Sequence, residues 1–244
     1  PTTPTTPTVE IPDEDVLGLN TDDHFAYIIG YPDGTVRPNG QITRAEATTI
    51  FFRLLTDESR EQFWSTSNVY PDVKAGQWYN NAVSTMTKAG IVDGYPDGTF
   101  RPDAPITRAE MAKIISLFAK LDRSESRFSD IAGHWAEAYI RLAAGNGWIA
   151  GYPDGTFAPQ RNITRAETAT MINRVLDRVP SEESHLLSRG VMQIWPDANP
   201  GDWFYLAMQE ATNSHDYERN AKWAAADEQW TALRETRDWK ALEQ

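Results

Sequence analysis

The hexapeptide Gly-Tyr-Pro-Asp-Gly-Thr occupies residues 30–35 and recurs at residues 94–99 and 151–156. Each copy is followed by Ile-Thr-Arg-Ala-Glu, which begins 12 residues after the first Gly every time, at Ile42, Ile106 and Ile163. Two motifs that keep one offset in three copies define a repeat array. The fold is therefore expected to consist of three related units, and the function to come from what the units present together.

Each hexapeptide predicts a turn, and each pentapeptide predicts the start of a helix. Pro presets φ in a turn, and Asp-Gly supplies a polar side chain and a residue that accepts positive φ. Thr-x-x-Glu is a capping box, in which Thr43 caps the helix and Glu46 reaches back to the cap backbone. The turn lacks the Asp ladder and the twelfth-position Glu of a calcium loop, so no metal ion and no cofactor are predicted.

Capping does not explain the Arg inside each pentapeptide, which is Arg44, Arg108 or Arg165. A cation at a helix N-terminus opposes the helix dipole, so it needs another reason to be there. One interpretation is a salt bridge to an aspartate elsewhere in the repeats, namely Asp72, Asp130 or Asp197. The other is a seat for a carboxylate or phosphate, formed by a guanidinium group beside free helix N–H groups. The residues alone leave both interpretations open.

A second motif lies between these segments and consists of an aromatic residue, an Asp two positions later, and then a Trp. Its copies run from Tyr70 to Trp78, from Phe128 to Trp135 and from Trp195 to Trp203. Apolar residues four, five and eight positions after each Trp give one face at helical spacing, so a helix is predicted there. A Trp at such a helix start is more often a core residue than a ligand-binding surface, and the Asp is as often a cap as a ligand contact.

The order of the motifs along the chain predicts a closed ring. The chain begins with a turn-motif half and ends with a Trp half, so each end lacks the half that the other carries. We expect the helix after Trp203 to pack on the first unit, near Ile28 or the helix that contains Ile50. This contact would close three units into a pseudo-threefold trimer and bury two open ends. The predicted fold class is mainly α, with short turns or strands and a C-terminal helix.

Composition narrows the classes of function. The chain has 244 residues, of which 40% are hydrophobic, and this suffices for a sizeable core. A net charge of −12 argues against nucleic-acid binding, which needs a basic face. The sequence contains no run of 18 apolar residues, so no membrane-spanning helix is predicted. The four His residues show no metal spacing and are predicted to lie at the surface. No constellation of catalytic side chains stands apart from the repeats, so an enzyme is not predicted.

The motifs resemble the S-layer homology (SLH) repeats of bacterial surface proteins over roughly residues 20–212. The resemblance implies a helical, three-pronged pseudo-trimer that attaches to the cell wall through grooves between the prongs. The implied partner is a wall glycopolymer, either a secondary polysaccharide that is often pyruvylated or modified peptidoglycan. The implied location is extracellular, at the cell wall or S-layer. The implied ligand-binding residues are the motif Arg, Trp, Asp and first Gly of each repeat: Arg44, Arg108, Arg165, Trp78, Trp135, Trp203, Asp72, Asp130, Asp197, Gly30, Gly94 and Gly151.

The chain departs from the family pattern in two ways. Relatives often place Lys just before the first Gly, where this chain has Ile29, Asp93 and Ala150. The Arg found at Arg37 and Arg101 becomes Ala158 in the third repeat. Grooves of unequal affinity are therefore predicted, with the groove at the first turn binding an anionic ligand best and the groove at the third turn binding it least.

The chain divides into six predicted segments. Residues 1–15 read as a Pro/Thr linker, which suggests a piece fused to a larger upstream surface protein. Residues 218–242 are rich in Ala, Glu, Lys, Arg and Leu without Gly or Pro, which predicts a helix with Trp223, Trp230 and Leu233 docked on the array. Short extra helices are expected within residues 56–67 and 178–193. The segments are the linker 1–15, repeats 16–68, 69–126 and 127–180, the closing segment 181–213 and the helical tail 214–244.

The predicted function is a non-catalytic module that anchors a protein to the cell wall. An acidic protein that meets an acidic wall polymer needs local positive sites, and the repeated Arg supplies them. The alternative is a protein–protein assembly module of a surface layer. Binding to purified wall material distinguishes the two.

Overall fold

The computed structural model describes residues 17–120, 122–125, 127–221 and 224–243, which form eight α-helices and one two-stranded antiparallel sheet. The mainly helical class predicted from the sequence is confirmed. The predicted linker, residues 1–15, and Trp223 lie outside the described residues. The helices are α1 (Arg44–Leu54), α2 (Asp57–Phe63), α3 (Asn80–Lys88), α4 (Arg108–Ser116), α5 (Glu137–Gly145), α6 (Arg165–Val175), α7 (Tyr205–Thr212) and α8 (Trp239–Leu242), with 3-10 turns at Glu183–His185 and Ala225–Asp227.

Helices α1, α4 and α6 begin at the three predicted capping boxes. In α1 the Thr43 hydroxyl accepts from the backbone N–H of Glu46, and the Glu46 carboxylate accepts from the backbone N–H of Thr43. The same reciprocal pair is formed at the starts of α4 and α6. Each cap contributes about 1 kcal/mol to helix stability. The short helices expected between the motifs are α2 and the 3-10 turn Glu183–His185.

The three units meet at a ring of backbone hydrogen bonds. The N–H of Ile42 donates to the carbonyl of Ile163 (3.3 Å), Ile163 donates to Ile106 (3.0 Å), and Ile106 donates to Ile42 (3.0 Å). Each Ile is the first residue of a pentapeptide and is at most 1% exposed. The cyclic pattern gives the trimer its pseudo-threefold axis.

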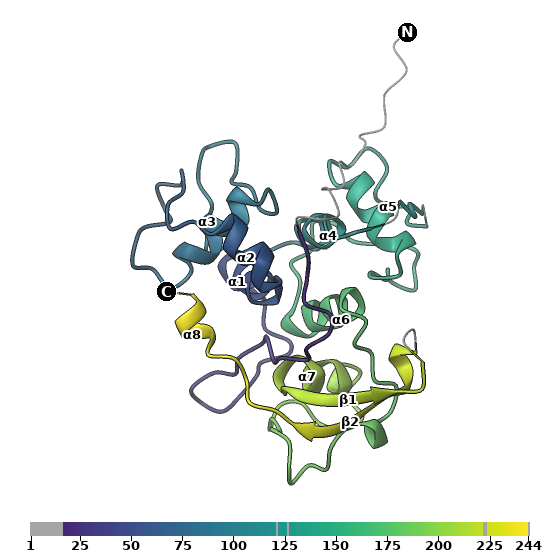
Figure 1. The fold of residues 1–244 in the computed structure, drawn as a ribbon. Coiled ribbons are helices and arrows are strands. Elements are labelled where there is room, and N and C mark those ends of the chain that lie inside the picture. The colour runs from purple at the N-terminus through teal and green to yellow at the C-terminus, as the bar shows by residue number, and fades with distance from the viewer. Residues whose placement is uncertain (1–16, 121, 126, 222–223, 244) are drawn as a thin grey trace.

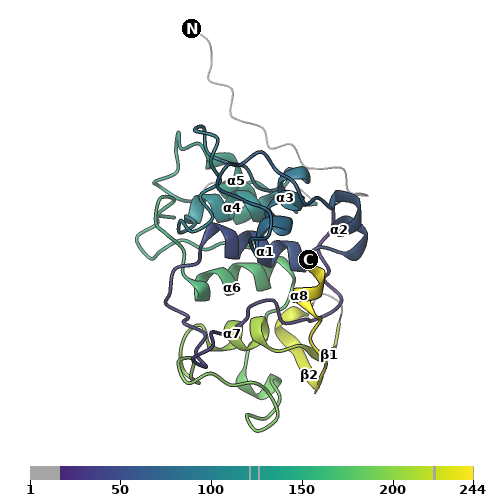
Figure 2. The same cartoon turned by 90° about the vertical axis from the view of Figure 1, so that its left-hand side faces the viewer.

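Three outer helices pack on the three inner ones. Helix α3 contacts α1, α5 contacts α4, and α7 contacts α6, which produces the three lobes seen in Figure 1. The view in Figure 2, turned by 90°, shows α6 between α1 and α7. The predicted closure is present, because the N–H groups of Tyr27 and Ile28 both donate to the carbonyl of Ala211 at the end of α7 (3.0 Å each).

The prediction of a helix over residues 218–242 was wrong for most of that segment. Residues His215–Arg219 form strand β1, which pairs with β2 (Glu228–Leu233), and only the four residues of α8 are helical nearer the C-terminus. The hairpin lies beside α7 in both views. Trp230 is buried as expected, whereas Leu233 is 40% exposed. Helix propensity is a weak prior, and strand pairing together with stacking of Tyr217 on His24 and of Trp230 on His215 overrides it here.

The prediction that all four His residues lie at the surface was also wrong. His24 and His215 are fully buried, because their rings stack on Tyr217 and Trp230 respectively, with centroids 3.8 Å apart in both pairs. The backbone N–H of His215 donates to the carbonyl of His24 (3.1 Å). This pair therefore joins the C-terminal hairpin to the segment before the first repeat.

Candidate functional site

The three motif Arg residues hold neighbouring repeats together. Each is 3–7% exposed. The Arg44 Nε donates to the carbonyl of Phe100 (2.8 Å), its Nη2 to the carbonyl of Asp93 (2.7 Å), and its Nη1 to the Glu110 carboxylate (2.7 Å). Phe100, Asp93 and Glu110 all belong to the next repeat, so one side chain links a helix start to a turn and to a capping box.

The same contacts recur around the ring. Arg108 donates to the carbonyls of Phe157 and Ala150 and pairs with the Glu167 carboxylate (3.3 Å). Arg165 donates to the carbonyls of Val36 and Ile29, and its Nη1 lies 3.6 Å from the Glu46 carboxylate. The salt-bridge interpretation is therefore supported, but its proposed partners were wrong. The acidic partner is the capping-box Glu of the adjacent repeat, not an Asp.

In the part of the chain that the structure describes, the first three N–H groups of α1, α4 and α6 are already hydrogen-bonded, so they do not form the predicted anion seat. At the start of α1, the N–H of Arg44 donates to Ala104, that of Ala45 to Pro102, and that of Glu46 to the Thr43 hydroxyl. The corresponding first two N–H groups of α4 and α6 also donate to carbonyls of a neighbouring repeat. An anion at these termini would have to displace bonds that hold the trimer together.

Electrostatics at the Arg108–Glu167 pair reflect burial and pairing. Burial lowers the pKa of Arg108, which nevertheless stays charged because an Arg pKa starts above 12. Burial alone would raise the pKa of Glu167. Hydrogen bonds from the Thr164 backbone and hydroxyl, together with the charges of Arg108 and Arg161, outweigh burial and leave that pKa below its ordinary value of 4.5.

We expect Glu167 to make the fold acid-sensitive. The pKa of Glu167 is depressed in the folded state, so the carboxylate stabilises the fold. This contribution to the free energy of unfolding is fully present at pH above the pKa of the unfolded chain and is lost as pH falls through the pKa of the folded chain. Glu167→Gln should be less stable than the parent chain at pH 7, and the gap should narrow below pH ~4. Urea unfolding between these pH values measures the gap, and a gap that stays constant would contradict the assignment.

The motif Asp residues bind backbone N–H groups of a turn and not the helices that follow them, so the cap interpretation was wrong. The Asp72 carboxylate accepts from the N–H groups of Phe100 (2.9 Å) and Arg101 (2.7 Å). Asp130 and Asp197 hold the equivalent N–H pairs of the other two turns. Arg101 has a φ of 57°, a left-handed conformation that is costly outside Gly, so the carboxylate fixes a strained turn.

The first Gly of each turn lies against an aromatic ring of the protein. A Cβ at Gly94 would stand 2.4 Å from the Tyr70 ring and 2.8 Å from the carbonyl of Thr99. Gly30 and Gly151 are crowded in the same way by Trp195 and Phe128. The group that approaches each of these Gly residues closely is the aromatic residue of the second motif.

The motif Trp residues are exposed, contrary to the expectation that such residues belong to the core. Trp78, Trp135 and Trp203 are 54%, 51% and 66% exposed. Each immediately precedes a buried aromatic or alanine residue that packs inward, namely Tyr79, Ala136 or Phe204. Three large apolar surfaces therefore face solvent at equivalent positions of the ring.

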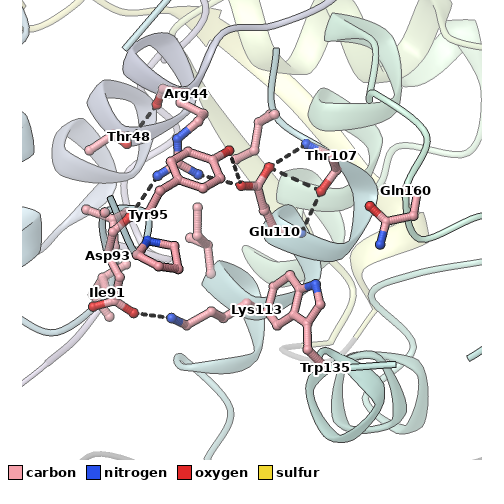
Figure 3. Close-up of a pocket in the computed structure, with 15 residues that line it drawn as sticks. Arg44, Thr48, Ile91, Asp93, Tyr95, Thr107, Glu110, Lys113, Trp135 and Gln160 are labelled. Carbon is pink, nitrogen blue, oxygen red and sulfur yellow. Dashed lines mark hydrogen bonds and ion pairs between the residues drawn. The ribbon is translucent and has the colours of Figure 1, made fainter. Parts of the chain in front are cut away.

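Two of these Trp residues line grooves between repeats. The larger groove, here called the repeat-two groove, has a volume of about 490 Å³ and is lined by residues of all three repeats. Figure 3 shows Arg44, Tyr95 and Asp93 on one side, Glu110 and Lys113 of α4 in the middle, and Trp135 on the other side. The smaller, repeat-one groove has about 150 Å³ and is lined by equivalent residues, which include Ile29, Glu46, Thr49, Trp78 and Arg165.

Lys113 distinguishes the repeat-two groove, and sequence reasoning missed it. It lies three residues after Glu110, at the position that Thr49 occupies in the repeat-one groove. Its ammonium group pairs with the carboxylate of Asp93. The helical spacing could have revealed Lys113, because a residue three positions after the capping-box Glu110 lies on the same face of α4, which is the side of the groove.

The third turn keeps a positive charge despite Ala158. The guanidinium of Arg161 lies 5.3 Å from the ring centre of Tyr152 and 3.4 Å from Glu167. In the first two repeats Arg37 and Arg101 occupy the equivalent place over Tyr31 and Tyr95. The premise that the third turn loses its local positive charge was therefore wrong.

Comparison with known proteins matches the sequence of this chain to a known family. A model of the S-layer homology domain matches residues 26–48, 69–112 and 127–169. The chain is 40% identical over 217 residues to "Cell surface glycoprotein 1" of Acetivibrio thermocellus, a match that covers 83% of this chain and 9% of that protein. It is 38% identical over 218 residues to the "Cellulosome-anchoring protein" of the same organism, with 86% of this chain and 47% of that protein covered. It is 32% identical over 159 residues to the "Surface-layer 125 kDa protein" of Lysinibacillus sphaericus, with 62% and 13% covered.

The chain belongs to the S-layer homology family. The family and these relatives confirm the predicted location at the bacterial cell surface. The chain spans less than half the length of the relatives just described. Among the described residues, none of the helices is long and apolar enough to cross a membrane.

Proposed function

We propose that this chain is a non-catalytic module that anchors a larger surface protein to the bacterial cell wall. It does so by binding an anionic wall glycopolymer in the grooves between repeats. A relative named as a cellulosome-anchoring protein and relatives named as surface-layer proteins support this role. The ligand class is a secondary cell-wall polysaccharide, with a carboxylate such as a pyruvate ketal as its acidic group.

The observation that carries the proposal is the repeat-two groove. An exposed Trp135 offers a flat apolar face for a sugar ring, and Tyr95, Thr107 and Gln160 supply polar groups for its hydroxyls. Arg44 and Lys113 supply positive charge in the same groove. Sites of this kind, mostly apolar with a few convergent polar groups, are typical of small-ligand pockets.

The geometry favours a different ranking of the grooves by affinity from the one predicted from the turn residues alone. The repeat-two groove is about 490 Å³ against about 150 Å³ for the repeat-one groove. The Asp93 charge, expected to weaken it, is neutralised by Lys113, which can swing to an incoming carboxylate. The repeat-two groove is therefore the primary site, and Trp135 and Lys113 are its ligand-contacting residues.

In this proposal the motif Arg, Asp and Gly residues act mainly by holding the groove in shape. Arg44 is committed to two carbonyls and a carboxylate, and Asp72 to two backbone N–H groups. The Arg44 guanidinium has further N–H groups, so it can also bind the ligand at the groove wall. The two Trp residues at the smaller groove and the third lobe, Trp78 and Trp203, would serve secondary sites.

Binding to purified wall sacculi tests the proposal. The chain should bind intact sacculi and lose at least about tenfold in affinity after the secondary polymer is removed, because the anionic sugar contacts are then gone. Free polymer fragments should compete with the intact wall. Equal binding before and after removal would assign peptidoglycan as the ligand. Self-association without wall binding would instead support the assembly module.

A further inference from the structure

Four buried side chains from distant segments meet beneath the C-terminal hairpin. They are His24 before the first repeat, Glu210 on α7, His215 on β1 and Glu228 at the start of β2. All four are fully buried, and each offers a ligand atom within 4.8 Å of every other. None of them lines either groove.

The distances from each His nitrogen to the other His and to the two carboxylates are close to those between ligands of a small cation, with Glu210 turning one oxygen toward each His. His24 Nδ1 lies 3.0 Å from His215 Nε2, 3.4 Å from Glu210 Oε1 and 3.2 Å from Glu228 Oε1. His215 Nε2 lies 3.4 Å from Glu210 Oε2 and 3.3 Å from Glu228 Oε1. Nitrogen and oxygen ligands at about 2.0–2.2 Å from a tetrahedral Zn²⁺ stand roughly 3.3–3.6 Å apart.

Outer groups orient His215 and Glu228 toward the centre of the cluster, whereas the outer nitrogen of His24, Nε2, has no hydrogen-bond partner among the described residues. His215 Nδ1 lies 3.0 Å from the carbonyl of Asn213, which can only accept, so Nδ1 carries a proton, and in the neutral ring Nε2 presents its lone pair to the cluster. The Glu228 Oε2 accepts from Arg219 (2.7 Å), which leaves Oε1 for the cluster. This is the arrangement of outer groups that fixes the tautomer of His and the direction of carboxylates in metal sites.

One carboxylate oxygen in the cluster has no hydrogen-bond donor. Glu210 Oε1 is buried and has no hydrogen-bond partner among the described residues, whereas its Oε2 accepts from the Trp230 indole (3.2 Å). A buried anionic oxygen without a hydrogen bond is costly, and the nearest charged group given for it is His24 Nδ1, 3.4 Å away. A cation among the four ligands would satisfy that oxygen and would replace the 3.0 Å hydrogen bond between the two His rings with two coordination bonds.

We propose that His24, Glu210, His215 and Glu228 form a structural site for a divalent transition cation, with Zn²⁺ as the best fit. Four protein ligands and full burial leave no open position for a substrate, so the site is structural and not catalytic. The cation joins the segment before repeat one, the closing helix and the C-terminal hairpin. The site therefore locks the two ends of the ring, and it does not depend on wall binding.

Metal analysis of the untagged chain tests the site. After chelator treatment and dialysis, titration with ZnCl₂ should give one tightly bound Zn²⁺ per chain and raise Tm by about 5 °C or more. Co²⁺ in place of Zn²⁺ should give the intense visible absorption of a tetrahedral complex. The Co²⁺ spectrum is read on the parent chain, so it does not depend on any variant folding.

A matched pair of variants locates the metal. Glu210→Gln keeps the size of the side chain and removes one ligand charge, and it should weaken Zn²⁺ binding by at least about 100-fold. His134→Gln removes an imidazole far from the cluster and should leave the titration unchanged. Failure of the parent chain to bind Zn²⁺ or to give the Co²⁺ band would overturn the site and leave a metal-free His–carboxylate network. Equal binding by Glu210→Gln would place the metal elsewhere.

Discussion

Arg108→Ala should lower the free energy of unfolding by about 3–5 kcal/mol, the loss expected when one partner of a buried ion pair is removed. Arg108 is 3% exposed and donates to the carbonyls of Phe157 and Ala150 as well as to Glu167. The substitution removes the donor from two carbonyls, takes one cation from the Glu167 carboxylate, which keeps its bonds from Thr164, and opens a cavity between two repeats. Tm should fall by roughly 10 °C, since about 2–4 °C accompany each kcal/mol in a chain of this size.

Arg101→Ala is the matched control for this loss. Arg101 is about half exposed and pairs with Asp97 at the surface, where solvent screens the interaction. The third repeat already carries Ala158 at the equivalent position, with the same positive φ, so alanine fits the turn. We expect little change in Tm. Thermal unfolding followed by circular dichroism compares the two variants, and equal losses would refute the linking role of Arg108.

Trp135→Ala should reduce affinity for an anionic wall fragment by tenfold or more, because an aromatic residue at the centre of an interface typically contributes about 2 kcal/mol or more. Half of the Trp135 side chain faces the groove and solvent. Its removal should therefore change Tm far less than Arg108→Ala does. Titration calorimetry with a defined fragment measures the loss, and the melting curve shows that the variant is folded.

Trp78→Ala provides the control for the choice of groove. Trp78 has the same repeat position and nearly the same exposure, but it lines the smaller, repeat-one groove. We expect it to cost less affinity than Trp135→Ala. A Lys113→Gln variant should reduce the salt dependence of binding, because it removes the cation that distinguishes the larger groove. A larger loss of affinity in Trp78→Ala than in Trp135→Ala would reverse the proposed ranking of the two grooves.

The sequence by itself determined the local architecture and the way the ring closes. The three helix starts follow from Thr-x-x-Glu, whose two hydrogen bonds join residues only three positions apart. The closure followed from the complementary ends of the repeat array, and the bonds from Tyr27 and Ile28 to Ala211 bear it out. Such features are readable because the groups that interact are either neighbours in sequence or copies of one motif.

Only the tertiary structure decided what the polar and aromatic side chains face. The acidic partner of Arg44 is Glu110, which lies 66 residues away, and the exposed side of Trp135 depends on how α5 packs against α4. The tail became a hairpin because His215 contacts His24 and Trp230 contacts Glu210, both outside the hairpin, and these contacts outweighed the helix propensity of its own residues. Burial and charge pairing depend on segments that come into contact only after folding. The pattern of neighbouring residues in the sequence does not indicate which distant segments these are.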